Sequence, residues 1–367
     1  MLWTVNKPQQ SGLYWLDEVH KGFYRALFAG RDFDDCFPNE FKPVLEASGK
    51  TNEYFQAVYD LYLLLEADHQ DSFKAIFDNH LNFTQAYSDA QFVVLSPNIQ
   101  APNTTEHSAI WKAVKTLGGY LYNTTIGLPC YAATRDTITC MNAHYEEYVR
   151  LNGVVCCFCG TEEMMEQRIV EPDEGAISDD EKQWRASYDH YLPKKHYPFL
   201  AVDFNNLVPC CQKCNEKAKG ELDVLHCEGV RTLAFDPYID LVPVALNASY
   251  DNTNGTFLMK IDIADTADQI FEKADTWNRT FQVLPRVNQR LKQFDGSWLA
   301  PVLCSADDAV QARDALTREA RRCNCFKKSE REAYYKSLCF NEIVNKSDSE
   351  IRAMLDTVDQ IYGPRSL

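Results

Sequence analysis

The sequence predicts a mainly helical α+β protein, and three observations support this fold class. Apolar residues recur at spacings of three and four in residues 1–150 and again after residue 265, which is typical of helices. Between these stretches, two alternating apolar runs flank Asn254-Gly255, a signal for a β-hairpin. A shorter segment carries closely spaced cysteine and polar residues instead of a long periodic pattern. We therefore expect a helical region over 1–150, a small cysteine-rich unit over 151–225, and a β-hairpin with helices over 226–367.

The N-terminal region is expected to be a helical scaffold or a surface that docks a partner. Its strongest pattern is TNEYFQAVYDLYLLLEADH at 51–69, where Tyr54, Val58, Leu61 and Leu65 repeat at helical spacing. Further helices are predicted at 12–28, 106–122 and 141–151. The histidines of this region are scattered along the chain, so the pattern does not indicate a catalytic site.

The C-terminal region is expected to begin with strands and to end with helices. The strand-like runs are 232–250 and 255–263. For the helices, a Ser followed three residues later by Asp or Glu resembles a capping box that begins a helix. Such pairs occur at Ser305 and Asp308, Ser329 and Glu332, and Ser347 and Glu350.

Composition and charge limit the classes of function that the protein can have. We expect a cytoplasmic protein that does not enter a membrane, because no apolar run approaches the ~20 residues of a membrane span and the start MLWTVNKPQQ does not resemble a secretory signal. The net charge of −16 disfavours long-range attraction to nucleic acid. The charge is uneven, however: residues 161–183 carry nine acidic residues against two basic ones, whereas residues 184–220 carry six basic residues against three acidic ones. We interpret the acidic segment as a solvated insertion beside a basic island.

Fourteen cysteines need an explanation other than disulfides if the compartment is reducing. Cys156 and Cys159 form one CxxC pair, and Cys211 and Cys214 form another. Two such pairs together supply the four thiolates of a tetrahedral structural Zn²⁺ site. The register is open to one alternative, because Cys157 and Cys210 lie directly beside these ligands; CxxC spacing on both sides favours the first set.

A second group of residues lies between and beside the cysteines: Asp189, His190, Asn206 and Asn215. Hydrolysis of a phosphodiester requires a base that activates water and a cation that neutralises charge on the phosphate and on the leaving oxygen. Histidine suits the first task. Carboxylate and amide oxygens are hard ligands, which favour Mg²⁺ or Mn²⁺.

These residues resemble the motif of the HNH endonuclease family, in particular the members with two CxxC pairs, a ββα-metal hairpin and helix, and Asn at the last motif position. The resemblance covers residues 152–222. It implies a Mg²⁺ or Mn²⁺ ion held by Asp189 and Asn215, His190 as general base, and Asn206 as a residue that orients the loop and the histidine. It also implies structural Zn²⁺ at the cysteines and hydrolysis of DNA to 5′-phosphate and 3′-hydroxyl ends.

Further segments (DHYLPK, NLVPCCQKCN and FDPYID) are similar to HNH nuclease subunits of bacterial anti-phage systems such as Septu. This resemblance implies an ATPase partner, which would also supply the DNA affinity that the acidic chain lacks. Alternatives are a stand-alone restriction-type nuclease and a catalytically silent adaptor that keeps only the zinc knuckles. We expect the lysines near the motif to contact nucleic acid: Lys194, Lys195, Lys213, Lys217 and Lys219.

Overall fold

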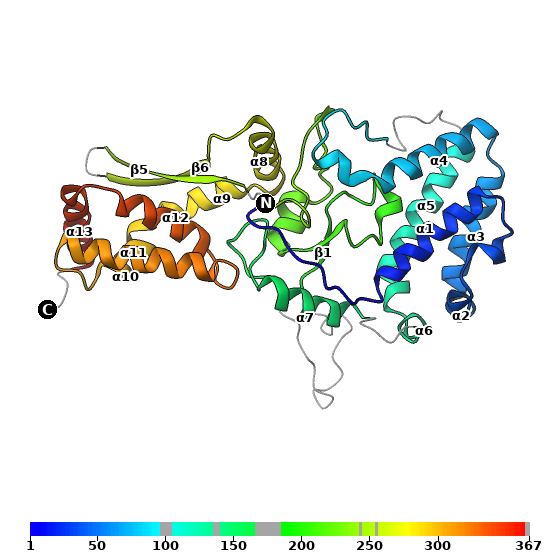
Figure 1. Cartoon of the computed structure of the whole chain (residues 1–367), viewed down its shortest axis with the longest axis horizontal. Helices are drawn as coiled ribbons and strands as arrows, with labels where there is room; N and C mark the ends of the chain where they lie inside the picture. Colours follow the sequence, from blue (N-terminus) through cyan, green and yellow to red (C-terminus); the bar gives the residue numbers. More distant parts are fainter. Residues whose placement is uncertain (96–104, 135–139, 166–184, 242–243, 254–255, 364–367) are drawn as a thin grey trace.

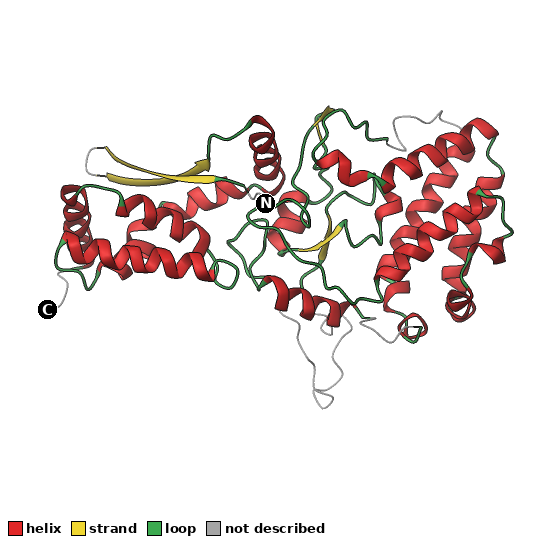
Figure 2. Cartoon of the chain, viewed as in Figure 1, coloured by secondary structure: helices red, strands yellow, loops and turns green. Residues whose placement is uncertain are grey.

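The computed structural model describes residues 1–95, 105–134, 140–165, 185–241, 244–253 and 256–363. The acidic segment predicted over 161–183 is therefore described only up to residue 165. The chain is mainly helical, with three two-stranded antiparallel sheets among these residues (Figure 2). The molecule is elongated, with the N-terminal helices at one end, the long hairpin and C-terminal helices at the other, and β1 between them (Figure 1).

Within the described residues, seven α-helices make up most of the N-terminal part. They are α1 (Tyr14–Phe28), α2 (Lys42–Ala47), α3 (Gly49–Leu63), α4 (Ala67–Leu81), α5 (Thr105–Asn123), α6 (Pro129–Ala132) and α7 (Met141–Asn152). The helices predicted at 12–28, 106–122 and 141–151 are confirmed as α1, α5 and α7. The single helix predicted over 51–69 is wrong, because Glu66 adopts an extended conformation and separates α3 from α4.

Aromatic side chains join these helices to the middle of the molecule. Phe199 lies in a short helical turn, Pro198–Leu200, that belongs to the central unit. Its ring is fully buried, with ring centroids 4.8 Å from Tyr24 of α1 and 5.1 Å from Phe77 of α4. Removing a buried Phe ring costs about 3–5 kcal/mol, so this one residue fixes the central loop firmly against the N-terminal helices.

The centre of the molecule holds a very short hairpin and a helix. Strands β1 (Tyr188–His190) and β2 (Leu207–Pro209) pair antiparallel, with Asp189 opposite Val208. The helical segment η7 (Lys213–Lys219) follows β2. A second small hairpin, β3 (His226–Cys227) with β4 (Val230–Arg231), comes next.

The long hairpin is confirmed in part. Strands β5 (Leu246–Thr253) and β6 (Thr256–Ile263) pair from Leu246↔Ile263 to Thr253↔Thr256, while Asn254-Gly255 lies outside the described residues. The strand predicted from residue 232 begins only at Leu246. At Asp236 the carboxylate accepts hydrogen bonds from the backbone N–H groups of Tyr238 and Ile239, which makes a turn and competes with strand pairing.

Helices complete the C-terminal part: α8 (Asp268–Phe281), α9 (Val283–Leu291), η8 (Asp295–Leu299), α10 (Ala300–Leu303), α11 (Ala309–Phe326), α12 (Ala333–Val344) and α13 (Asp348–Tyr362). The capping box of Ser347 and Glu350 is confirmed at the start of α13. The other two predicted boxes are wrong. Asp308 itself caps α11 by accepting from two backbone N–H groups, and α12 begins after Glu332, which has a positive φ and no side-chain cap.

No helix among the described residues has the length and apolar character needed to cross a membrane. The N-terminal segment, residues 1–9, begins at the centre of the molecule (Figure 1), where the backbone N–H of Leu2 donates to the Cys157 carbonyl and that of Val5 to the Pro237 carbonyl.

Gly153 joins α7 to the first cysteine pair and provides a stability test. It has φ +82°, and an added Cβ would lie 2.2 Å from the carbonyl oxygen of Lys328. Gly229 has a similar φ of +83°, but a Cβ there would meet nothing within 4 Å. We expect Gly229→Ala to cost about 1 kcal/mol from the left-handed backbone alone. Gly153→Ala should cost about 1–3 kcal/mol more.

Urea denaturation of the two variants measures this difference. Equal losses of unfolding free energy in Gly153→Ala and Gly229→Ala would show that the α7 end does not pack tightly against Lys328.

Candidate metal centre and active site

Four cysteines meet at the centre of the chain. The sulfur atoms of Cys156, Cys159, Cys211 and Cys214 all lie within 4.8 Å of one another, and all four residues are buried. The Cys159 and Cys211 sulfurs are 3.8 Å apart. Tetrahedral Zn²⁺ with Zn–S bonds of about 2.3 Å places its sulfurs about 3.8 Å apart. The set predicted from CxxC spacing is thus the set that the fold brings together, and it can hold a metal ion such as zinc.

The thiols of the cluster differ in their electrostatics: burial raises the pKa of Cys214 well above its ordinary value, whereas the pKa of Cys211 is lowered. Hydrogen bonding with the Cys156 thiol, and with other thiols of the cluster, lowers the pKa of Cys211 to about 5. A cationic group also reaches the cluster: Nη2 of Arg286, on α9, lies 3.2 Å from the Cys214 sulfur and donates to it. An arginine hydrogen-bonded to a ligating thiolate is the kind of outer contact that stabilises a metal site.

Distant segments of the chain hold the first cysteine pair in place. The three carbonyls of residues 157–159 each accept one hydrogen bond from elsewhere. The donors are the Leu2 backbone N–H to Cys157, Trp277 Nε1 of α8 to Phe158, and the Tyr335 hydroxyl of α12 to Cys159. The Phe158 ring also stacks on Phe281 with centroids 4.3 Å apart. Both ends of the chain therefore pack on this loop.

Asp189 and His190 lie side by side on β1, next to the cysteine cluster. Asp189 is buried, and its Oδ1 accepts a hydrogen bond from the Lys219 ammonium at 2.9 Å. The other carboxylate oxygen, Oδ2, is buried without a hydrogen-bond partner. Burial raises the pKa of Asp189, although the Lys219 charge opposes the shift. A carboxylate oxygen that has lost water and gained no donor is suited to a divalent cation.

Lys219 links the strand to the helix. Its ammonium also donates to the His190 carbonyl at 2.8 Å, and its side chain is fully buried. Since Lys219 is the last residue of η7, these two bonds fix η7 against β1. Asn215, half-buried, lies four residues earlier on the same element.

The orientation of His190 defines its tautomer. Its Nε2 lies 2.9 Å from the carbonyl oxygen of Ala201, and a carbonyl only accepts, so Nε2 carries the proton. The lone pair then lies on Nδ1, where it can accept a proton. Burial lowers the pKa of His190 to about 3, which keeps the imidazole neutral. The ring is covered on one side by Tyr122 of α5, with centroids 4.6 Å apart and a T-shaped geometry.

Asn206 stabilises the loop between β1 and β2. Its side-chain oxygen accepts from the Leu192 backbone N–H at 2.7 Å, and its amide nitrogen donates to the carbonyls of Leu192 at 2.9 Å and Leu200 at 3.4 Å. Leu200 directly precedes Ala201, which accepts the His190 hydrogen bond. Asn206 therefore acts on the histidine through the loop backbone.

The five lysines that we expect to contact nucleic acid occupy different environments. Lys219 is buried against Asp189, so the expectation is wrong for this residue in this structure. Lys195 pairs with Glu221, and Lys213 with Glu162, both near the surface. Lys217 is exposed. Lys194 lies with its ammonium 5.3 Å from the centre of the Tyr122 ring, the ring that covers His190.

Three contributions were not foreseen from the sequence: Tyr122 beside His190, Lys219 on Asp189, and Arg286 on Cys214. Tyr122 and Arg286 come from helices far from the motif along the chain, and no local pattern marks them. Lys219 was noticed for its charge, but its burial depends on the packing of η7 against β1.

Comparison with known proteins gives a limited similarity. The chain is 31% identical to protein ea31 of Escherichia phage lambda over 109 residues, which are 29% of this chain and 28% of ea31. The match thus spans well under a third of either protein. No family model matches the chain, and no solved structure matches it.

The cysteine assignment is tested by two neighbouring substitutions. Cys156→Ala removes a member of the cluster, so we expect the purified protein to lose most of its bound zinc and much of its stability. Cys157→Ala, one residue away and equally buried, should retain about one zinc per chain. Metal analysis by mass spectrometry, together with thermal unfolding, measures both effects. Zinc loss in Cys157→Ala but not in Cys156→Ala would reverse the register.

The buried pair of Asp189 and Lys219 is tested by a double-mutant cycle. Lys219→Met leaves a buried carboxylate without its partner, which we expect to cost about 3 kcal/mol of unfolding free energy. Adding Asp189→Asn removes the uncompensated charge and should recover a large part of the loss. As a control, Lys195→Met breaks an exposed pair and should cost under about 1 kcal/mol. Additive losses in the double mutant would show that the two residues do not interact.

Proposed function

We propose that the chain is a divalent-metal-dependent endonuclease that hydrolyses DNA phosphodiester bonds, with an active site of the HNH type. The observation that carries the proposal is the junction of β1 and η7. There an Asp with one unpartnered carboxylate oxygen adjoins a His with a defined basic nitrogen, and Lys219 ties both to the helix that carries Asn215. The neighbouring cysteine cluster, which can hold zinc, supports the same proposal.

Each residue then has one task in hydrolysis. The Mg²⁺ or Mn²⁺ that Asp189 Oδ2 and the Asn215 amide would hold supplies positive charge to the phosphate and to the departing 3′ oxygen. His190 accepts the proton of the attacking water at Nδ1 while its Nε2–H stays on the Ala201 carbonyl. The water oxygen bonds to phosphorus as the P–O3′ bond breaks, and the departing 3′ oxygen takes a proton from solvent, which leaves 5′-phosphate and 3′-hydroxyl ends. His190 then returns its proton to solvent.

The low pKa of His190 has a consequence for this mechanism. A base with a pKa of about 3 is neutral and ready to accept a proton, but it holds that proton weakly. The negative charge of a bound phosphodiester favours the protonated imidazole and so raises the pKa of His190 when substrate arrives. We expect Lys194, whose ammonium lies 5.3 Å from the centre of the Tyr122 ring, to contact the same DNA backbone.

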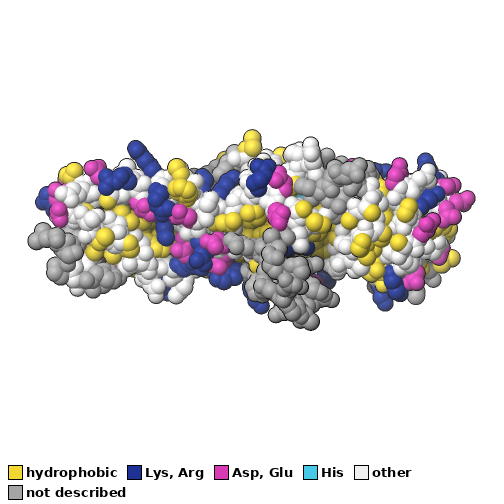
Figure 3. All heavy atoms as spheres, turned by 90° about the horizontal axis from the view of Figure 1, so that it is seen from below, with side chains coloured by type: hydrophobic (Ala, Val, Ile, Leu, Met, Phe, Trp, Pro, Cys, Tyr) yellow, Lys and Arg dark blue, Asp and Glu magenta, His cyan; other side chains and the backbone are white. Residues whose placement is uncertain are grey.

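DNA affinity is expected to come partly from a partner. The chain has a net charge of −16, and on the face shown in Figure 3 Lys and Arg are interspersed with Asp and Glu over much of the surface. From the resemblance to HNH nuclease subunits of bacterial anti-phage systems, we propose an ATPase as that partner and an anti-phage role in the cytoplasm. Co-purification of an ATPase in fixed ratio from the native host separates this assignment from a stand-alone restriction-type nuclease.

A second candidate function is supported by the Asp189–Lys219 pair. Lys219 already neutralises Asp189, the carboxylate proposed to bind the cation. Burial also lowers the pKa of His190 to about 3. Both features also suit a structural unit. In that case the chain is a zinc-knuckle adaptor without catalysis, and the four motif residues serve only to stabilise the fold.

Cleavage of supercoiled plasmid with Mg²⁺ or Mn²⁺ tests the nuclease assignment. We expect nicking that falls at least about a hundredfold in His190→Ala, the usual loss when a general base is removed. His196→Ala, in the same loop but without a proposed role, should cleave like the wild type. Equal cleavage by wild type and His190→Ala would contradict the assignment of His190. Absence of cleavage by the wild type, with and without the co-purified partner, would favour the adaptor.

A further inference from the structure

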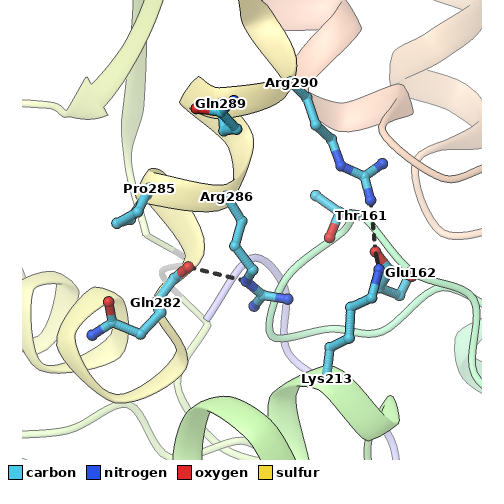
Figure 4. Close-up of a pocket in the computed structure, with 8 residues that line it drawn as sticks. All are labelled: Thr161, Glu162, Lys213, Gln282, Pro285, Arg286, Gln289 and Arg290. Carbon is cyan, nitrogen blue, oxygen red and sulfur yellow. Dashed lines mark hydrogen bonds and ion pairs between the residues drawn. The ribbon is translucent and has the colours of Figure 1, made fainter.

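A pocket with a volume of about 600 Å³ lies beside the cysteine cluster, since its lining residue Arg286 donates to the Cys214 sulfur. It is formed by the loop after the first cysteine pair, the start of η7 and one face of α9 (Figure 4). The lining residues are Thr161, Glu162, Lys213, Gln282, Pro285, Arg286, Gln289 and Arg290. Lys213 and Asn215 are two residues apart on η7 and so do not share a helix face, which separates this pocket from the proposed catalytic residues.

Two hydrogen-bonding groups of this pocket are buried without a partner. Thr161 is 2% exposed, and its hydroxyl has no hydrogen bond. Arg286 Nη1 is also buried and unbonded. The other nitrogens of the Arg286 guanidinium are hydrogen-bonded: Nε donates to the Gln282 carbonyl at 3.0 Å, and Nη2 donates to the Phe281 carbonyl at 2.7 Å. Figure 4 shows the guanidinium directed from α9 toward the loop that carries Thr161.

The charges of the lining are unbalanced. Three cationic side chains line the pocket against one carboxylate. Glu162 accepts from both Lys213, at 2.8 Å, and Arg290, at 2.7 Å. Arg290 also forms an ion pair with Glu332, which lies outside the pocket. Arg286 donates from Nη2 to the Cys214 sulfur. An unused Arg N–H, an unused hydroxyl and an excess of cations together suit a ligand that carries several acceptor oxygens and negative charge.

We propose that this pocket binds a phosphate group, with Thr161 and Arg286 as its inner donors and Lys213 and Arg290 at its rim. The group belongs either to a nucleic-acid backbone or to a small free phosphate compound, because both present the same oxygens. The site is distinct from the proposed nuclease centre and does not depend on that function. Phosphate binding at this site is non-covalent.

Binding of inorganic phosphate to the full-length, zinc-loaded protein is the direct test, measured by isothermal titration calorimetry without added divalent cation. Thr161→Val keeps the shape of the buried side chain and removes the hydroxyl, so we expect about fivefold weaker binding. Lys213→Gln should weaken it about tenfold through loss of a charged donor. Lys292→Gln, the same charge change directly after α9 and outside the pocket, should leave affinity unchanged. Unchanged zinc content in each variant confirms that the knuckle is intact.

The source of the phosphate is decided by fluorescence anisotropy with a labelled DNA duplex, again without divalent cation. If the pocket receives a backbone phosphate, Thr161→Val and Lys213→Gln weaken duplex binding and inorganic phosphate competes with the duplex. If it receives a small compound, the same variants lose phosphate binding while duplex affinity stays at the wild-type value.

The proposal is overturned if the wild type binds no phosphate, or if Thr161→Val and Lys213→Gln bind it as the wild type does. A drop in Lys292→Gln equal to that in Lys213→Gln would also overturn it, because the effect would then be one of overall charge. None of these readouts requires cleavage, so they are independent of the plasmid assay.

Discussion

The meeting of two cysteine pairs organises the centre of this protein. Cys159 and Cys211 are 52 residues apart in the sequence, yet their sulfurs lie 3.8 Å apart in the interior. Closing such a loop costs conformational entropy, and bringing thiolates together in a buried site costs electrostatic energy. A tetrahedral metal ion offsets both costs, which is why small loop-rich units use one. Since η7 begins at the second cysteine pair, the cysteine cluster also sets where that helix lies.

The position of η7 in turn determines the proposed active site. With Cys214 fixed in the cluster, Lys219 at the other end of η7 reaches Asp189 and the His190 carbonyl on β1. The carbonyls of the first cysteine loop bind the N-terminal segment, α8 and α12. The same small unit therefore orients the proposed catalytic residues and joins the N-terminal segment to the C-terminal part. We expect loss of a metal ion from the cysteines to disturb both the proposed site and this packing.

The Asp189–Lys219 ion pair is the main observation against a catalytic role, because the lysine contacts the carboxylate that is proposed to bind the metal ion. A buried carboxylate needs a positive partner, and in the absence of a divalent ion the ammonium provides it. Only one of the two carboxylate oxygens is engaged, and the other is left without a donor. The arrangement thus suits a carboxylate that is shared between a lysine, which holds it in place, and a cation.

Much of the local structure could be predicted from the sequence because it depends on neighbouring residues. CxxC spacing gave the four cysteines, and the apolar runs on either side of Asn254-Gly255 gave the hairpin β5–β6. Contacts between distant segments could not be predicted. The charge of Lys219 suggests a surface residue, but the packing of η7 buries it. Tyr122 beside His190 and Arg286 beside Cys214 arise only when α5 and α9 fold against the centre. Asp236 shows the opposite case, where a local side-chain turn ended a strand that the apolar pattern predicts.

The most direct test of the central claim is anomalous X-ray diffraction from crystals of the protein grown with Mn²⁺. Data on either side of the manganese and zinc edges distinguish the two metals. We expect zinc among the four cysteine sulfurs and a separate manganese peak in contact with Asp189 Oδ2 and the Asn215 amide oxygen. Zinc at the cysteines with no manganese at Asp189, and Lys219 still its partner, would contradict a catalytic metal site at this position.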